Sequence, residues 1–319
     1  MSTSTDWKII DFHTHIRPPG TKPRPLGGVQ LSEGEQAIQQ TRFRKLLDVD
    51  LLVKESEEGE IDLRLLSATI EGFFGTEGPT DIDQIRRIND FLAETQQRHP
   101  GRLGGLATID AFSGETGARE VERAVKELKL AGIVIDSSRD QRFPGHPSTR
   151  PVLEAAAALK VPVLVHPVGA PNSADLSREG GVPGYALGRG FVNGFAFLSV
   201  LRSGIWRDLP DLHLIFTAMG VGALVIAAEE TEAYSDTRRK RDDKPNIYFD
   251  IMGLNPPTIR YLVDFLGAER VLVGSDWPIW RPVSRQALAS AFVAAGLTAP
   301  QQQLIAEGNA RRLLNLRGA

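Results

Sequence analysis

The stretch Lys8-Ile9-Ile10-Asp11-Phe12-His13-Thr14-His15 is typical of a buried β-strand whose end carries two histidines. Residues two apart in a strand lie on the same face, so we expect His13 and His15 to point in one direction. Two imidazoles on one face can bind a single ion. The stretch therefore predicts the first half of a metal site at the end of a first strand.

Two runs much further along the chain end in residues of the same kind. Val161 to Val165 is followed by His166, and Val271 to Ser275 is followed by Asp276. Imidazole and carboxylate groups are ordinary ligands for a catalytic divalent metal. We therefore predict that one histidine and one aspartate from these strand ends complete the site that the first-strand histidines begin.

The composition is that of an ordinary soluble globular protein. The chain has 319 residues, 41% hydrophobic and 24% charged, with a net charge of −3, which gives no sign of a nucleic-acid or membrane surface. It has no cysteine, so disulfides, thiolate ligands and a cysteine nucleophile are excluded. The polar start, Met1 to Lys8, is not typical of a signal peptide, and we expect a cytoplasmic protein.

Eight strand-like segments alternate with helix-like segments. Several are runs of Val, Ile and Leu, which is typical of parallel strands buried on both faces. This alternation favours a (β/α)8 TIM barrel, formed by residues 1–319 as one domain, over an open doubly wound sheet. The active site of such a barrel lies at the C-terminal ends of the strands, where all four candidate ligands fall. The predicted strands are Lys8–His13, Leu63–Thr69, Arg102–Ile109, Gly132–Asp136, Val161–His166, His213–Thr217, Asn246–Asp250 and Val271–Ser275.

Helical periodicity is clear in three of the connecting segments, Asp81–Arg98, Gly117–Leu130 and Pro151–Leu159. Two other segments are longer than a minimal barrel needs. Ile16–Glu60 follows the first strand and Pro167–Gly190 follows the fifth, and both are rich in glycine, proline or charge. We predict long loops there, on the catalytic side, that bind or cover the substrate.

Five motifs together resemble one known family, the amidohydrolase-related family of aminocarboxymuconate-semialdehyde decarboxylase and its relatives. They are IIDFHTH, VPVLVHP, SGIWRDLPDLHLIFTAMG, VLVGSDWPI and EGNARRLLNL, and the likeness runs from about Lys8 to Leu316. The resemblance implies a (β/α)8 barrel with one divalent metal, most often zinc, with manganese and iron as alternatives. Members hydrolyse, decarboxylate or hydrate small carboxylated, often ring-derived compounds. Matched by position, the metal ligands are His13, His15, His166 and Asp276.

The chain departs from the family pattern at the sixth strand. The family usually has a histidine there that activates water or handles the substrate proton, and this chain has Ala218 at that position. Three explanations stay open. Asp276 acts as the base, His146 reaches in from the loop after the fourth strand, or the reaction needs no such group.

Several further residues are candidates for substrate binding or support. Arg42, Arg44 and Arg189 lie in the two long segments, and guanidinium binds carboxylate in a bidentate manner, although each could simply be solvated. Trp277 could wall an apolar pocket or pack beneath the last loop. Asp11 either orients a ligand or forms a buried structural hydrogen bond. Capping or loop hydrogen bonds explain Asp250 and Glu71 as well as a functional role does.

We predict a metal-dependent hydrolase of a small carboxylated compound. The metal would lower the pKa of a bound water from about 16 toward about 7, with Asp276 as the base. Non-oxidative decarboxylation on the same site is the first alternative, and a non-catalytic ligand-binding barrel is the second. The expected partners are a small anionic substrate and further copies of the chain as a homo-oligomer, with no nucleic acid and no membrane.

Overall fold

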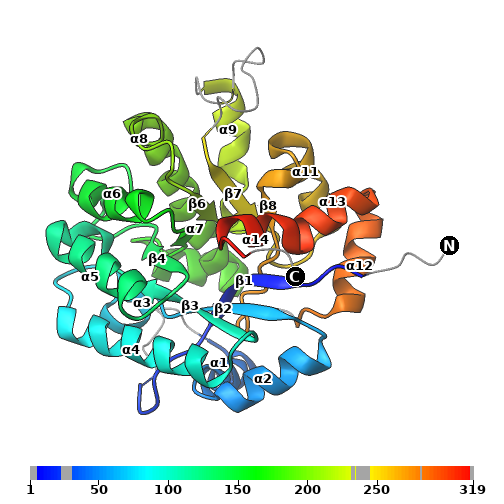
Figure 1. Cartoon of the computed structure of the whole chain (residues 1–319), viewed down its shortest axis with the longest axis horizontal. Helices are drawn as coiled ribbons and strands as arrows, with labels where there is room; N and C mark the ends of the chain where they lie inside the picture. Colours follow the sequence, from blue (N-terminus) through cyan, green and yellow to red (C-terminus); the bar gives the residue numbers. More distant parts are fainter. Residues whose placement is uncertain (1–5, 23–30, 231–233, 235–244, 281, 317–319) are drawn as a thin grey trace.

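The computed structural model describes residues 6–22, 31–230, 234, 245–280 and 282–316. Eight parallel strands follow one another in sequence order, each hydrogen-bonded to the next, and helices surround them (Figure 1). This arrangement confirms the predicted (β/α)8 barrel. The strands are β1 (Ile10–His15), β2 (Leu63–Ser67), β3 (Leu103–Thr108), β4 (Gly132–Asp136), β5 (Val163–His166), β6 (Leu214–Phe216), β7 (Ile247–Asp250) and β8 (Val271–Leu272).

Backbone hydrogen bonds between β1 and the segment after β8 bring the first and last strands together. The Phe12 N–H donates to the Val273 carbonyl at 2.9 Å, and the Asp276 N–H donates to the His13 carbonyl at 2.8 Å. These bonds place residues from the two ends of the chain side by side at the C-terminal rim. The first-strand histidines and Asp276 are therefore neighbours in space.

Most of the helices form an outer layer, whereas α14 (Asn309–Leu313) lies across the middle of the barrel in Figure 1. None of the helices within the described residues has the length and apolar character needed to span a bilayer. The α-helices are α1 (Glu33–Leu46), α2 (Val49–Glu58), α3 (Ile70–Phe74), α4 (Ile82–Arg98), α5 (Glu115–Lys126), α6 (Arg150–Ala158), α7 (Ser173–Ser203), α8 (Ile205–Asp208), α9 (Gly222–Glu230), α11 (Pro256–Leu266), α12 (Arg285–Ala294), α13 (Ala299–Gln303) and α14 (Asn309–Leu313). Short turns of other helix types are η1 (Ala111–Ser113), η2 (Pro147–Thr149), η3 (Ala218–Gly220), η5 (Ala268–Arg270) and η6 (Leu304–Gly308).

The segment after β1, predicted as a long loop, is largely helical, and this part of the prediction is wrong. It contains α1 and α2. Ser32 caps α1 by accepting from the Glu35 N–H, and the Glu35 side chain accepts from the Ser32 N–H in return. No residue of α1 is buried, so the sequence carries no apolar periodicity that could reveal the helix.

The segment after β5 is also helical rather than a loop. It forms the first half of the 31-residue α7, whose backbone breaks at Gly181 with φ +61°. Glycine and proline suggested a loop, but the glycines let this helix pack closely. A Cβ on Gly190 would lie 2.5 Å from the Met219 carbonyl oxygen, which belongs to η3 after β6. Close packing thus explains the glycine content better than a loop does.

The barrel interior is a compact apolar layer to which every strand contributes. Its members are Ile10, Phe12, Leu65, Leu106, Val134, Leu164, Ile215, Tyr248 and Leu272, and Ala310 and Leu313 of α14 pack against it. The neighbouring residues on each strand point outward and pack under the helices. Because side chains alternate along a strand, the residues two positions beyond this layer form the floor of the C-terminal mouth.

Candidate active site

A polar layer lies directly above the apolar interior of the barrel. Its residues stand two positions after an interior residue on each strand, so the alternation of the strand directs them inward. Asp136 and His166 are aligned as neighbours in the β4–β5 register. The layer comprises Ser67, Thr108, Asp136, His166, Thr217 and Asp250. The first and last strands are the exceptions. Gly274 occupies the corresponding position after β8, so that Asp276 lies four residues beyond the interior Leu272, and β1 contributes two of the predicted ligands.

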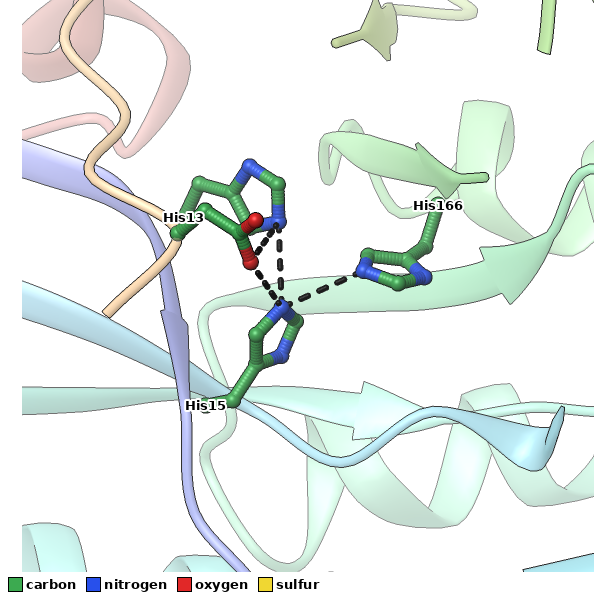
Figure 2. A group of neighbouring side chains, drawn as sticks. His13, His15 and His166 are labelled. Atoms are coloured by element: carbon green, nitrogen blue, oxygen red, sulfur yellow. Dashed lines mark hydrogen bonds and ion pairs between the residues drawn. The ribbon is translucent and has the colours of Figure 1, made fainter. Parts of the chain in front are cut away.

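An irregularity in β1 brings His13 and His15 to the same point. The register of β1 against β2 shifts between Asp11 and Thr14, so Phe12 fills the interior and the next residue, His13, can still face the mouth. The Nε2 atoms of His13 and His15 are 3.1 Å apart (Figure 2). The prediction that both imidazoles point in one direction is confirmed.

His166 and Asp276 complete the cluster. The Nε2 atom of His166 lies 3.2 Å from that of His15. One oxygen of Asp276, Oδ1, lies 3.1 Å from Nε2 of His15 and 3.5 Å from Nε2 of His13. All four side chains are buried, and their potential ligand atoms lie within 4.8 Å of one another. The structure thus brings together the four residues predicted from the sequence, in an arrangement that could hold one metal ion.

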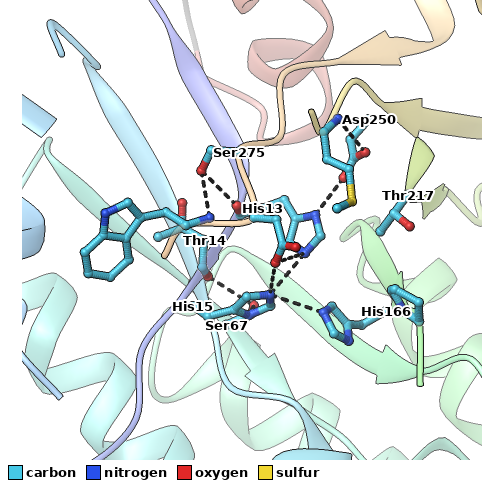
Figure 3. A network of polar contacts seen from close by, with 12 residues as sticks. His13, Thr14, His15, Ser67, His166, Thr217, Asp250 and Ser275 are labelled. Carbon is cyan, nitrogen blue, oxygen red and sulfur yellow. Dashed lines mark hydrogen bonds and ion pairs between the residues drawn. The ribbon is translucent and has the colours of Figure 1, made fainter. Parts of the chain in front are cut away.

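The hydrogen bonds on the far side of two imidazoles fix which nitrogen faces the cluster as an acceptor (Figure 3). The Nδ1–H of His13 donates to Oδ2 of Asp250 at 2.7 Å. The Ser67 hydroxyl donates its single hydrogen to the Thr14 carbonyl at 3.1 Å, so it accepts from His15 Nδ1 at 2.9 Å. In the neutral imidazoles both Nε2 atoms then carry lone pairs, which repel each other and Asp276 unless a positive charge lies between them. This donor set fits a divalent cation.

The pKa shifts of the three histidines also indicate that the cluster requires a positive charge. Burial on its own lowers the pKa of His13, but the negative charges of Asp276 and Asp250 outweigh it and raise that pKa to about 9. Burial lowers the pKa of His15 and brings the pKa of His166 well below its ordinary value. Without a metal, a proton on His13 therefore balances the carboxylates, while the other two rings are neutral.

Asp250, for which the sequence left a functional role and a capping role equally open, lies against His13 in the structure. Its Oδ1 accepts hydrogen bonds from the backbone N–H groups of Ala218 at 2.9 Å and Met252 at 3.1 Å, which leaves Oδ2 for His13. Gly274 provides the space, because a Cβ there would lie 2.7 Å from Oδ2 of Asp250. The inward position of Asp250 at the end of a strand was the available signal in the sequence.

Asp11 has the structural role that was one of its two predicted roles. Its Oδ1 accepts from the backbone N–H of His13 at 3.1 Å and of Ser275 at 2.9 Å, and its Oδ2 pairs with the buried guanidinium of Arg64. The carboxylate thus connects β1, β2 and the segment after β8 beneath the site. It holds the backbone of His13, and its negative charge contributes to the raised pKa of the His13 side chain.

Arg189 and Arg42 both lie near the cluster, but they are bonded differently. Nη1 of the buried Arg189 lies 2.7 Å from Oε2 of Glu71, whose Oε1 accepts from the Gly169 N–H. Burial lowers the pKa of Arg42 while the negative charge of Asp276 partly offsets this, so the two charges interact across the mouth. Arg189 forms an internal ion pair with Glu71, whereas the only charged group that acts on Arg42 among the described residues is Asp276.

Three predicted site residues lie outside the cluster. Arg44 is exposed and donates to the Thr41 hydroxyl on its own helix. His146 is exposed, and its Nδ1 accepts from the Ser148 N–H at 3.1 Å as the cap of η2, so it does not replace the missing histidine. Trp277 is buried and its indole N–H donates to Glu55 at 2.7 Å, as expected for the packing role, which was one of its two predicted roles.

Two residues beside the site complete its description. Ala218 is buried at the start of η3, and His213 stands at the opposite end of β6 with its Nδ1 near the Tyr248 hydroxyl. Asp136 accepts from the Glu71 N–H through Oδ2, and its buried Oδ1 has no hydrogen-bond partner among the described residues. Burial, followed by the charge of Glu71, raises the pKa of Asp136 well above its ordinary value.

Three histidines and an aspartate at the mouth of a (β/α)8 barrel define a class of metal-dependent barrel enzymes. The chain belongs to the amidohydrolase family, whose sequence model matches residues 10–316. The family resemblance found in the sequence motifs is therefore confirmed.

Curated relatives of the chain are named as decarboxylases. It is 25% identical over 299 residues to 2-amino-3-carboxymuconate-6-semialdehyde decarboxylase of Dictyostelium discoideum, covering 84% of this chain and 81% of the relative. It is 28% identical over 295 residues to gamma-resorcylate decarboxylase of a Polaromonas species, covering 85% of this chain and 89% of the relative. These names favour the decarboxylase alternative and do not support hydrolysis, which was our first prediction.

A solved structure shares the fold over nearly the whole chain. Dihydroxybenzoic acid decarboxylase from Polaromonas, solved with bound manganese and the inhibitor 2-nitroresorcinol, superposes with a TM-score of 0.77 at 24% identity, covering 98% of each chain. At this identity the likeness demonstrates the fold alone. The manganese in that neighbour agrees with a divalent metal in this class of barrel and gives no specific support to zinc.

Proposed function

We propose that this protein is a metal-dependent, non-oxidative decarboxylase of a small aromatic or muconate-like carboxylic acid. The observation that carries the proposal is the convergence of His13, His15, His166 and Asp276 within 4.8 Å at the barrel mouth, in a chain whose relatives are named as decarboxylases. The four side chains would hold one divalent ion. When bound, this ion would stabilise the negative charge that develops on the substrate as carbon dioxide leaves.

The reaction breaks the bond between the substrate carbon and its carboxylate and replaces it with a C–H bond. The electron pair of the broken bond stays on the substrate carbon, carbon dioxide departs, and one proton must be delivered to that carbon. Asp276 is the candidate for this delivery. Burial raises its pKa, but the neighbouring His13 and His15 outweigh burial and lower it, so Asp276 is a carboxylate in the resting site.

Asp276 must therefore collect a proton before it can deliver one. A hydroxyl group on the substrate, placed beside the carboxylate, is a suitable source, because it gives up its proton to Asp276 and the same proton can then reach the ring carbon. This route uses no histidine at the end of β6. It is consistent with the alanine at position 218, which leaves a buried methyl group at that side of the site.

Substrate orientation would depend on Arg42. Its half-buried guanidinium interacts with the charge of Asp276 and is not used in an ion pair among the described residues, so it can attract the reacting carboxylate toward the ion. Arg189 contributes from the other side as a fixed positive charge that lowers the pKa of His166 and Asp276. Because its guanidinium is paired with Glu71, we propose that Arg189 acts on the site through its positive charge and does not contact the substrate directly.

The choice of metal follows from the ligands and the relatives. Three imidazoles and one carboxylate suit zinc, manganese and iron alike. We propose manganese first and zinc second, because a decarboxylase with the same fold was solved with manganese.

The test measures carbon dioxide from a panel of acids. The protein, loaded separately with manganese and zinc, is incubated with 2,6-dihydroxybenzoate, other ortho-hydroxybenzoates, benzene dicarboxylates that carry a hydroxyl, and a muconate semialdehyde, each labelled with ¹³C at the carboxyl carbon. We expect labelled carbon dioxide from at least one acid and at least a hundredfold less from Asp276→Asn. Carbon dioxide from none of the acids, together with cleavage of an amide, ester or lactone, would contradict decarboxylation.

A further inference from the structure

Arg17 stands two residues beyond His15, where the chain leaves β1. Its backbone N–H donates to the Leu46 carbonyl at 2.7 Å, at the end of α1, and the preceding Ile16 N–H donates to the Ser67 carbonyl at 3.1 Å. The chain therefore continues in register with β2 past the ligand residues. This fixes Arg17 at the outer rim of the same mouth that contains the metal cluster.

Two aromatic rings hold the guanidinium of Arg17. Its central carbon lies 4.4 Å from the ring centre of Phe73 on α3 and 5.5 Å from that of Phe43 on α1. Nη2 donates to the Gly72 carbonyl, and a Cβ on Gly72 would lie 3.7 Å from Nη1, in ordinary contact. Cation–π contacts on this platform keep the planar group in place without neutralising its charge.

No carboxylate balances this charge within the part of the chain that the structure describes. Arg189 is paired with Glu71, and Arg42 is attracted by Asp276, but no acidic group acts on Arg17. Its Nε is buried and has no hydrogen-bond partner there. Nη1 makes no hydrogen bond among the described residues and is not one of the buried unpartnered atoms. Burying a cation without a counter-ion costs free energy, so an anionic ligand that pairs with the guanidinium through Nη1 would bind with advantage.

We propose that Arg17, on the platform of Phe43 and Phe73, is the binding site for a second anionic group of the substrate. The ligand class is an aromatic acid with two acidic groups, one directed to the metal cluster and the other to Arg17. The Cα atoms of residues two apart along a strand are about 6.6 Å apart, so the backbone of Arg17 lies within the length of one substituted benzene ring of the backbone of His15. The proposal rests on the proposed function for the position of the first carboxylate.

Binding calorimetry with two probes tests the assignment on the metal-loaded protein. Isophthalate, with two carboxylates, and benzoate, with one, are titrated into the unsubstituted protein, Arg17→Met and Arg17→Lys. The matched control is Arg207→Met, which removes an arginine stacked 4.4 Å over Trp206 on α8, the helix before β6, which lies far from α1 and α3 in Figure 1. We expect Arg17→Met to weaken isophthalate binding by about 10- to 100-fold and benzoate binding by less than about threefold.

The two remaining variants complete the comparison. Arg17→Lys keeps the charge without the planar fork and should give an intermediate loss for isophthalate. Arg207→Met should bind both acids like the unsubstituted protein. If Arg17→Met fails to fold, the Arg17→Lys variant carries the test, and an unchanged affinity for isophthalate would overturn the proposal.

Three other results would overturn the proposal. They are an unsubstituted protein that binds isophthalate no more tightly than benzoate, an Arg17→Met variant with unchanged isophthalate affinity, and an equal loss for both acids, which would make Arg17 a structural residue. The readout is heat of binding, not turnover. A protein that releases no carbon dioxide and cleaves an amide, ester or lactone would therefore refute the proposed function and leave the assignment of Arg17 to be judged on affinity.

Discussion

At the scale of single residues, the site depends on how its imidazoles are oriented. Asp250 receives the Nδ1–H of His13 at 2.7 Å and is held by two backbone N–H groups. Replacing this carboxylate with an amide removes the charge that fixes the tautomer of His13. We expect Asp250→Asn to bind manganese or zinc about 10- to 100-fold more weakly, measured by competition with a chelating dye.

The matched control for this substitution is Asp264→Asn, which alters an exposed carboxylate paired with Arg260 on α11. It should leave metal affinity unchanged. An Asp250→Asn variant with full metal affinity would show that the carboxylate does not orient His13 for binding.

The elevated pKa of His13 predicts a pH dependence of metal binding. The group is protonated below about pH 9 in the metal-free protein, and a protonated imidazole cannot bind a metal. The apparent affinity should therefore rise about tenfold per pH unit as the pH increases toward about 9 and then level off. Dye competition between pH 6 and 10 measures this slope. In Asp250→Asn the affinity should level off at a lower pH, because the substitution removes one of the negative charges that raise the pKa of His13. A flat profile would contradict the protonation of His13.

At the scale of secondary-structure elements, the strands were predictable and two inserted segments were not. Each of the eight strands overlaps a predicted segment, and several of these segments are runs of Val, Ile and Leu, because strands buried on both faces need continuous apolar sequence. Helix α1 has no buried residue and α7 is rich in glycine, so neither shows the apolar stripe on which sequence reasoning depends.

The ligands were equally predictable, because each ends a strand that can be recognised. The sequence could not decide between two roles for Asp250 and did not point to Arg17, since the contacts of both residues are with side chains and rings far away in the sequence. From the sequence alone we ranked hydrolysis above decarboxylation. The metal ligands serve both reactions, so they could not correct this ranking.

The close packing of α7 against η3 predicts how substitutions of glycines in α7 change the stability of the protein. Gly190→Ala would place a Cβ 2.5 Å from the Met219 carbonyl oxygen, so the helix that carries Arg189 must move. We expect a loss of about 1–3 kcal/mol in the free energy of unfolding, measured by denaturant titration. Gly180→Ala, in the same helix with no atom within 4 Å, should be neutral or slightly stabilising. Equal stability of the two variants would contradict this account of the packing.

At the scale of the whole molecule, one ion would connect strands from the beginning, middle and end of the chain. His13 and His15 come from β1, His166 from β5 and Asp276 from the segment after β8. A ligand that binds only the folded state stabilises it, by about 4 kcal/mol at a thousandfold excess over the dissociation constant. Removing the metal with a chelator should therefore lower the melting temperature by several degrees.

Differential scanning calorimetry with and without the chelator measures this shift. The matched control is His166→Ala, whose melting temperature should not respond to the chelator. If the unsubstituted protein also fails to respond, the cluster does not stabilise the barrel through a bound ion.

The central claim is that four side chains at the barrel mouth bind one divalent metal. Inductively coupled plasma mass spectrometry of the protein, dialysed after loading with manganese or zinc, tests it most directly. We predict close to one ion per chain for the unsubstituted protein and close to none for His13→Ala or Asp276→Ala. Less than about a tenth of an ion per chain in the folded, unsubstituted protein, or undiminished metal in either variant, would contradict the claim.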